Sequence, residues 1–115
     1  MTADQARTGK HPETTAFQKR VYAAVANVPA GFVTTYARLA EQLGCRSAQA
    51  VGQALRANPF APRIPCHRVI RSSGHIGGFQ GSAGGPAVAL KRRRLAQEGV
   101  RFDRTGRLLE PARIT

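Results

Sequence analysis

Residues 63–71 read Arg63-Ile64-Pro65-Cys66-His67-Arg68-Val69-Ile70-Arg71. The run sets a thiol beside an imidazole, and its β-branched end predicts a strand. Pro65 restricts the backbone immediately before the sulfur. The arginines favour a thiolate over a thiol and attract an anionic partner. The stretch indicates a reactive cysteine that acts near nucleic acid; the alternative is a buried structural cysteine on an ordinary strand.

The charge of the chain narrows the class of partner. Eighteen Lys and Arg residues stand against six Asp and Glu residues, a formal net charge of +12, and fifteen of the eighteen cations are arginine. A guanidinium group matches phosphate oxygens in a fork and tolerates partial desolvation better than an ammonium group. Because no basic amphipathic anchor stands out, we expect nucleic acid rather than a membrane as the partner. The alternative is scattered surface charge with no polyanionic partner.

Length and cysteine content bound the architecture. A chain of 115 residues, 42% of them hydrophobic, supports one globular domain. It shows no apolar run typical of a membrane span or a signal peptide. Cys45 and Cys66 do not make a disulfide framework, and no CxxC or HxxxH spacing indicates zinc. We therefore expect a monomer in the reducing bacterial cytosol, with no metal and no cofactor.

Hydrophobic periodicity predicts four helices after a loose tail at residues 1–15. A capping box of Thr15 and Gln18 begins the first helix. Gly44 is the expected left-handed cap at the end of the second helix, and Ser47 caps the start of the third. The expected helices span residues 16–28, 36–43, 48–57 and 87–98.

The remaining segments are expected to add a small β-hairpin. The strand that carries Cys66 turns at 72–75 and returns as a strand at 76–79. The last helix carries the run Lys91-Arg92-Arg93-Arg94, which is expected on a solvated face that adds phosphate attraction. Residues 101–115 are expected as an extension or a short terminal hairpin. The predicted fold is mainly α with a small β-hairpin, a winged helix-turn-helix-like DNA-binding domain at 16–100.

The second and third expected helices form a helix-turn-helix pattern, because a short glycine-containing turn joins them. Gln49, Gln53 and Arg56 recur on one face of the third helix, with the small residues Ala48 and Gly52 beside them. A face of small residues edged by Gln and Arg can approach a DNA groove closely. The alternative is the solvated polar face of an ordinary amphipathic helix.

Several motifs surround the Cys66 run at characteristic spacings: Thr35-Tyr36 with Leu39-Ala40, Ala50-Val51-Gly52, Asn58-Pro59, Ser73-Gly74 with Gly77-Gly78-Phe79, and Lys91 with Glu98-Gly99. Together with Pro65-Cys66-His67-Arg68-Val69 they resemble the C-terminal domain of O6-alkylguanine-DNA alkyltransferases (methylated-DNA-protein-cysteine methyltransferases) and the related alkyltransferase-like proteins. The resemblance covers residues 16–100.

The resemblance implies a DNA repair protein that binds duplex DNA in the minor groove, flips O6-alkylguanine and transfers the alkyl group irreversibly to Cys66. In that scheme His67 is the base, acting through a water, and Glu98 orients it. Asn58 braces the turn before the cysteine, and Tyr36 lies beside the flipped nucleotide. DNA contacts are implied for Tyr36, Ser47, Ala48, Gln49, Gly52, Gln53, Arg56 and Arg68. The resemblance also implies that the lesion pocket is lined by Pro65, Val69, Phe79, Gln80 and Gly81.

The chemistry of the residues agrees with these roles. Neighbouring side chains on an extended strand point to opposite faces, so His67 needs a bridging water or a local kink to act on the Cys66 sulfur. A carboxylate such as Glu98 on the other ring nitrogen fixes the tautomer of the imidazole. Nothing in the chain offers to cleave a thioether afterwards, so we expect one transfer per molecule.

Three departures from the family pattern leave the function open. Gln49 stands where the family carries an arginine that fills the gap left by the flipped base. Second, Phe79 replaces the usual pocket tyrosine, and Gln80 replaces a small residue. Third, the loop at 81–85 is longer than is typical, and the separate N-terminal domain of longer members is missing. The first hypothesis is therefore an alkyltransferase. The second is a lesion sensor with little or no transfer that recruits nucleotide excision repair, and a third is a helix-turn-helix transcription factor.

Overall fold

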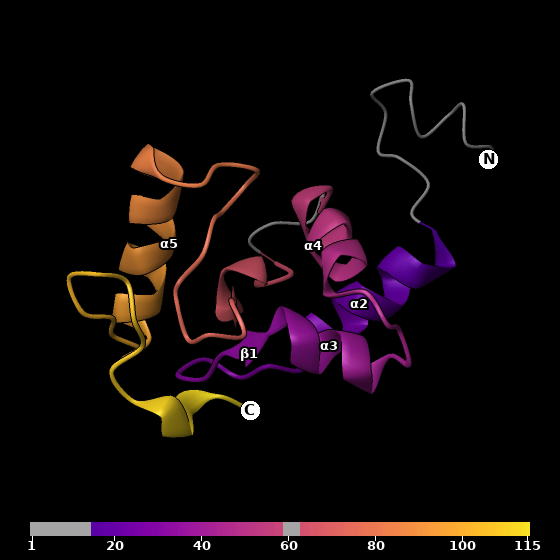
Figure 1. The fold of residues 1–115 in the computed structure, drawn as a ribbon, viewed down its shortest axis with the longest axis horizontal. Coiled ribbons are helices and arrows are strands. Elements are labelled where there is room, and N and C mark those ends of the chain that lie inside the picture. The colour runs from indigo at the N-terminus through magenta and orange to yellow at the C-terminus, as the bar shows by residue number, and fades with distance from the viewer. Residues whose placement is uncertain (1–14, 59–62) are drawn as a thin grey trace.

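The computed structural model describes residues 15–58 and 63–115. Most of the predicted tail at 1–15, and Pro59 of the Asn58-Pro59 motif, lie outside the described residues. The helices α2, α3 and α4 gather on one side of the molecule and α5 lies on the other (Figure 1). The segment that carries Cys66 runs between the two groups. No helix of the described ranges is long and apolar enough to cross a membrane.

Helix α2, Ala16–Ala26, begins as its sequence predicts. The Thr15 hydroxyl accepts a hydrogen bond from the Gln18 amide at 3.0 Å, and the Gln18 side chain accepts one from the Thr15 amide at 2.9 Å. These reciprocal bonds satisfy two of the free N–H groups at a helix start and confirm the capping box. The face that includes Val21 and Val25 is buried, and it packs against α4.

Helices α3, Tyr36–Gln42, and α4, Ala48–Arg56, form the helix-turn-helix. Thr35 caps α3 through a 3.1 Å bond from the Arg38 amide, and Ser47 caps α4 through a 3.0 Å bond from the Ala50 amide. Gly44 between them has φ +68°, the left-handed conformation expected at this helix end. The first core joins these helices to α2; its buried members are Val21, Tyr22, Ala24, Val25, Leu39, Ala40, Val51, Ala54, Leu55 and Val69.

The predicted hairpin around Cys66 is wrong. The cysteine lies in a 3-10 turn, Cys66–Arg68, and only Val69–Ile70 forms a strand, β2. This strand pairs in parallel with β1, Thr34–Thr35, with Thr34 opposite Val69 and Thr35 opposite Ile70. The segment expected to return at 76–79 does not pair with β2, because Gly77 leaves the extended region at φ +74°.

The second core lies under α5, Gly85–Gln97, and the C-terminal residues. Phe102 and Leu108 face each other across a short antiparallel bridge, and both are buried. The chain then passes through a 3-10 turn, Pro111–Arg113, and Ile114 pairs with Val33 beside β1. This core contains Val33, Ile70, Ile76, Leu95, Val100, Phe102 and Leu108. The observed fold is mostly helical with a two-stranded sheet.

Candidate active site

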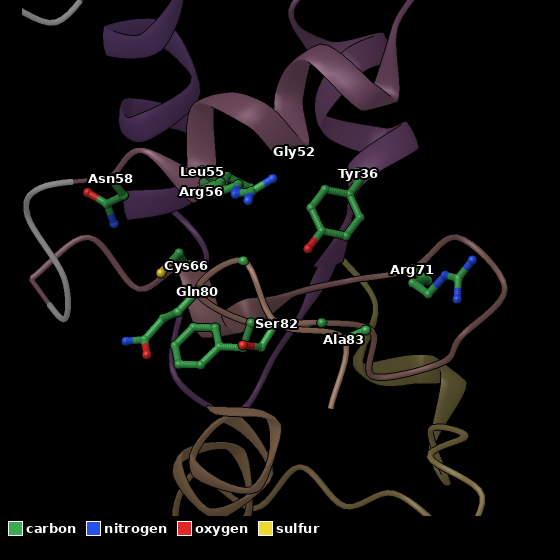
Figure 2. A pocket seen from close by; sticks show the side chains of 13 residues that line it. Tyr36, Gly52, Leu55, Arg56, Asn58, Cys66, Arg71, Gln80, Ser82 and Ala83 are labelled. Atoms are coloured by element: carbon green, nitrogen blue, oxygen red, sulfur yellow. The ribbon is translucent and has the colours of Figure 1, made fainter. Parts of the chain in front are cut away.

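The Cys66 pocket is a cavity of about 500 Å³ between the two halves of the molecule (Figure 2). One wall comes from Tyr36 of α3 and from α4, and the opposite wall from the loop at 78–83. Figure 2 shows the Tyr36 hydroxyl directed into the cavity. The lining residues are Tyr36, Gly52, Leu55, Arg56, Asn58, Cys66, Arg71, Gly78, Phe79, Gln80, Gly81, Ser82 and Ala83.

A tight turn presents Cys66 to this cavity. The Cys66 amide donates to the Ile64 carbonyl at 2.8 Å, and the Arg68 amide donates to the Pro65 carbonyl at 2.9 Å. The Asn58 side chain donates to the same Ile64 carbonyl at 3.3 Å. The turn is therefore held from two directions, and the half-buried thiol lines the pocket. The kink that the sequence required between Cys66 and His67 is this 3-10 turn.

Behind Cys66, His67 and Glu98 form a hydrogen-bonded pair. His67 Nε2 lies 3.0 Å from Glu98 Oε2, and His67 is buried. Burial lowers the pKa of His67 below its usual 6.5, against the opposing hydrogen bond and charge of Glu98. A neutral imidazole that donates from Nε2 keeps a lone pair on Nδ1. That atom is buried and has no hydrogen-bond partner among the residues that the structure describes. His67 is thus suited to accept a proton.

Arg68, for which the resemblance implied a DNA contact, completes this network. Its Nε and Nη2 donate to the two oxygens of Glu98 at 3.0 and 2.8 Å, and its Nη1 donates to the Val28 carbonyl at 2.8 Å. Burial raises the pKa of Glu98, but hydrogen bonds from Arg68 and His67 outweigh it and leave the pKa below the usual 4.5. The carboxylate therefore stays ionised beside the imidazole.

Three residues of the implied lesion pocket line it, and two do not. Phe79, Gln80 and Gly81 line the cavity, and the ring centroid of Phe79 also lies 5.8 Å from the guanidinium carbon of Arg94. Pro65 and Val69 are buried and do not line the cavity, because the 3-10 turn directs Cys66 alone toward it and Val69 joins the first core.

Backbone conformation constrains this wall tightly. Gln80 adopts φ +51°, a left-handed conformation that costs a residue with a side chain on the order of 1 kcal/mol or more. Phe79 and Ser82 exchange two backbone hydrogen bonds of 2.9 Å. A Cβ atom at Gly78 would lie 2.5 Å from the Ser82 carbonyl oxygen, so only glycine fits there. The wall is a preformed turn rather than a loose loop.

A second hollow, the α4 groove, adjoins the Cys66 pocket and shares Tyr36, Gly52, Arg56 and Arg71 with it. Its volume is about 540 Å³. The structure brings Ala48, Gln49 and Gln53 together here, as the helical spacing predicts. Ser47 caps α4 and does not line the groove. Sequence reasoning missed the opposite rim: Arg71, Ser72 and Ser73.

Gly52 of α4 faces the ring of Tyr36. A Cβ atom at Gly52 would lie 3.9 Å from Tyr36 Cε1, in ordinary contact, so a larger side chain would press on the phenol. Burial raises the pKa of Tyr36, and the nearby Cys66 adds to the effect. The phenol therefore keeps its proton and remains a hydrogen-bond donor at neutral pH.

Lys91 is a supporting residue whose position the sequence did not predict. The expectation of a solvated face is wrong for it: Lys91 is 0% exposed. Its Nζ donates to the carbonyls of Val69 at 2.7 Å, Ile76 at 2.6 Å and Gly78 at 3.0 Å. Burial lowers its pKa to about 7. One side chain thus ties the strand after Cys66 to the loop that forms the opposite pocket wall. Besides the motif of Lys91 with Glu98-Gly99, the sequence signals this position by its place three residues after Val88 and four before Leu95 on the apolar face of α5.

The sequence profile described as "6-O-methylguanine DNA methyltransferase, DNA binding domain" matches residues 16–100. The chain belongs to this family. A methylated-DNA–protein-cysteine methyltransferase of Methanothermobacter thermautotrophicus is 45% identical over 89 residues, 77% of this chain and 47% of that protein. A DNA base-flipping protein of Thermus thermophilus is 49% identical over 65 residues, 56% of this chain and 44% of that protein. The chain spans about half the length of these relatives.

Solved structures show the same family fold. Schizosaccharomyces pombe Atl1, in complex with damaged DNA containing O6-carboxymethylguanine, has a TM-score of 0.76 at 33% identity, covering 90% of this chain and 97% of that one. Mycobacterium tuberculosis OGT in complex with DNA has a TM-score of 0.65 at 38% identity, covering 76% and 52%. The predicted resemblance and the helical DNA-binding fold are therefore confirmed.

Proposed function

We propose that this protein repairs DNA by binding duplex DNA in its minor groove, taking O6-alkylguanine into the Cys66 pocket and transferring the alkyl group to Cys66. The observation that carries the proposal is the position of the thiol: Cys66 lines a cavity that opens beside the α4 groove. A base rotated out of a duplex seated on α4 enters that cavity. Atl1 and OGT, which share this fold, were each solved in complex with DNA, and this supports DNA as the partner.

The transfer step follows from the buried network behind the thiol. His67 Nδ1 takes the thiol proton through a water, and Glu98 stabilises the imidazolium that results. The thiolate sulfur attacks the alkyl carbon, the sulfur–carbon bond forms and the carbon–O6 bond breaks. The bonding electrons leave on guanine O6, and guanine takes up one proton, which balances the proton lost by the thiol. The product is a thioether on Cys66 and an unmodified guanine, so each molecule reacts once.

Tyr36 is positioned to assist the departure of guanine. The leaving oxygen gains negative charge as the carbon–oxygen bond breaks, and a donor in the cavity lowers the free energy of that state. The Tyr36 hydroxyl points into the cavity and retains its proton, since burial raises its pKa. Asn58 contributes by bracing the Ile64 carbonyl before Cys66.

The second candidate is a lesion sensor of the alkyltransferase-like kind, which holds the flipped base with little or no transfer and recruits nucleotide excision repair. Two observations favour it. Gln49 on the rim of the α4 groove is neutral where the family pattern carries an arginine. The similarity to Atl1 also covers nearly the whole of both chains, 90% and 97%.

One experiment separates the two candidates. The protein is incubated with a duplex that contains O6-methylguanine, and its intact mass is measured. A gain of one methyl group that disappears in Cys66→Ser supports transfer. Preferential binding of the lesion duplex with unchanged mass supports the sensor. Neither a mass gain nor a preference for the lesion would overturn both.

A companion variant tests the role of Gln49. Gln49→Arg adds a cation at the rim of the α4 groove and should tighten lesion binding about five-fold, the equivalent of roughly 1 kcal/mol. Fluorescence anisotropy with lesion and unmodified duplexes measures the change. An affinity that stays at the parent value would show that another residue fills the vacated base stack.

A further inference from the structure

We propose that the C-terminal hairpin, residues 101–109, extends the DNA interface with a phosphate-binding surface carried by Arg104 and Arg107. The inference rests on the proposed function, because it takes the α4 groove as the seat of duplex DNA. Residues 101–109 lie beyond the segment 16–100 that matches the family profile. The surface therefore lies outside the segment that the family profile describes.

The hairpin is docked on the rim of the α4 groove. The Leu108 amide donates to the Gly74 carbonyl at 2.8 Å, and the Ile76 amide donates to the Gly106 carbonyl at 2.8 Å. Arg107 Nη1 donates to the carbonyl of Ser73 at 3.2 Å, and Ser73 lines the groove. These bonds place the hairpin directly against the rim turn at 71–76.

The turn of the hairpin fits its neighbour closely. His75 Nε2 donates to the Thr105 carbonyl at 3.0 Å, while its Nδ1 accepts from the Gly77 amide at 3.0 Å. Gly106 has φ +92°, and a Cβ atom there would lie 2.6 Å from His75 Nε2. Only glycine allows this contact, so the rim turn and the hairpin form one block. A surface on that block is preorganised with respect to the groove.

Buried and exposed side chains alternate along the hairpin, and the exposed ones include two arginines. Phe102 and Leu108 are buried in the second core, whereas Arg104 and Arg107 are exposed. The one carboxylate of the hairpin, Asp103, accepts bonds from the Thr105 amide, the Thr105 hydroxyl and the Arg107 amide at 2.8, 2.6 and 3.0 Å. It serves the turn itself. Neither guanidinium contacts a carboxylate of the described residues.

Arg71 joins this surface to the reactive pocket. It lines both the Cys66 pocket and the α4 groove, and Figure 2 shows it across the pocket from Cys66 with Tyr36 between them. From Arg71 through Ser73 to Arg107 the rim is continuous. Arginine binds phosphate in a fork and keeps its charge at any physiological pH. A strand of duplex DNA that crosses the α4 groove thus meets Arg71 first and the hairpin next.

The test compares two double variants that remove the same charge. Arg104→Gln with Arg107→Gln removes the proposed surface. Lys19→Gln with Arg93→Gln removes two exposed cations from α2 and α5, outside both hollows. The affinity of each for duplexes with and without O6-methylguanine is measured from 50 to 200 mM salt, a range over which phosphate contacts show their salt dependence.

We expect the hairpin variant to flatten the slope of log affinity against log salt by about one to two, since each lost phosphate contact removes about 0.9. Both duplexes should weaken by the same factor, because phosphate contacts carry no lesion preference. Equal slopes in the two variants would overturn the proposal. Arg104→Gln alone, at the exposed turn and without a hydrogen bond to lose, gives the same comparison if the double variant folds poorly.

The outcome for the surface is separable from that for the proposed function. If the parent protein gains no mass and does not prefer the lesion duplex, the proposed function is wrong, whatever the slopes of log affinity against log salt are. A parent that transfers the methyl group, with slopes unchanged by the hairpin variant, retains the function and loses the surface.

Discussion

Lys91 and Glu98 both lie on or just after α5, behind the segment that carries Cys66, yet their charges are held in opposite ways. Glu98 meets two cationic or proton-bearing partners, Arg68 and His67, within 3.0 Å. Lys91 meets no carboxylate among the described residues and donates to three backbone carbonyls. The Glu98 arrangement supports proton transfer to His67, whereas the Lys91 arrangement holds two backbone segments together.

The difference indicates that one residue supports the chemistry of the pocket and the other supports its structure. The Glu98 network borders the imidazole and sets its tautomer, so changing it should alter chemistry more than structure. The Lys91 anchor joins Val69 to Gly78 across the pocket, so changing it should alter structure first. Removing or weakening each partner in turn tests this division.

The largest effect on stability is expected from Lys91→Met. Methionine preserves much of the volume but removes the donor that three backbone carbonyls share, which should lower the free energy of unfolding by on the order of 3 kcal/mol. Urea-induced unfolding measures the loss, and Arg93→Met, an exposed position of the same helix, is the matched control with a change of about 0.5 kcal/mol or less. Hydrogen exchange should rise at residues 76–80. A Lys91 variant as stable as the control would show that the anchor does not support the fold.

Glu98→Gln should reduce stability less than Lys91→Met does, and its main effect should be a fall in the rate of methyl transfer. The amide still accepts one hydrogen bond, but Arg68 loses its counter-charge, at a cost of about 1–2 kcal/mol. Without the carboxylate the imidazolium is not stabilised, and the transfer rate should fall on the order of 100-fold. Rapid-quench measurement of methyl transfer gives the rate. Glu110→Gln, at an exposed carboxylate 3.4 Å from Arg113, is the control. An unchanged rate in Glu98→Gln would show that Glu98 does not assist the proposed proton transfer to His67.

The pH dependence of stability should separate the two residues. The pKa of Lys91 is about 7 in the fold and 10.5 in the unfolded chain, so the unfolded chain binds the extra proton and stability rises as pH increases between these values. The pKa values of His67 and Glu98 are lowered by folding, so stability falls as pH drops below 6.5 and again below 4.5. Denaturant titrations from pH 4 to pH 10 should show both trends. Lys91→Met should abolish the alkaline rise and leave the acid fall; the reverse result would contradict these assignments.

The smallest effect is expected from Arg68→Lys. Lysine keeps the charge but cannot donate in a fork to both Glu98 oxygens while reaching the Val28 carbonyl, which should cost about 1 kcal/mol of stability. Because Glu98 keeps a cationic neighbour, methyl transfer should slow by less than about ten-fold. Stopped-flow transfer assays and thermal unfolding measure the two effects. A loss of transfer as deep as that of Glu98→Gln would mean that guanidinium geometry, not charge, positions the carboxylate.

The parts of the fold that local chemistry determines could be predicted from the sequence. Thr15, Thr35 and Ser47 each cap the helix that follows, because a hydroxyl beside free N–H groups needs no distant partner. The grouping of Gln49 and Gln53 on one rim likewise follows from helical spacing. The helix-turn-helix is therefore present in the sequence pattern.

What the sequence could not show depends on distant contacts. The partner of Val69 and Ile70 is β1, more than thirty positions earlier, and not the local return strand that the turn residues favoured. Lys91 is buried because three carbonyls from two separate segments converge on it, which no property of a charged run reveals. The resemblance implied a DNA contact for Arg68, and nothing in the sequence shows that Glu98, thirty residues later, binds its guanidinium group.

The two-stranded sheet has a consequence for the precision of the site. Thr35 ends β1 and caps α3, so Tyr36 follows directly, while Val69 opens β2 immediately after the turn of Cys66. The pairing of Thr34 with Val69 therefore fixes the position of the Tyr36 phenol relative to the Cys66 sulfur. A slip of one residue would shift them by about 3.3 Å relative to each other, the length of a hydrogen bond. Four residues thus fix the distance between the Tyr36 phenol and the Cys66 sulfur across the pocket.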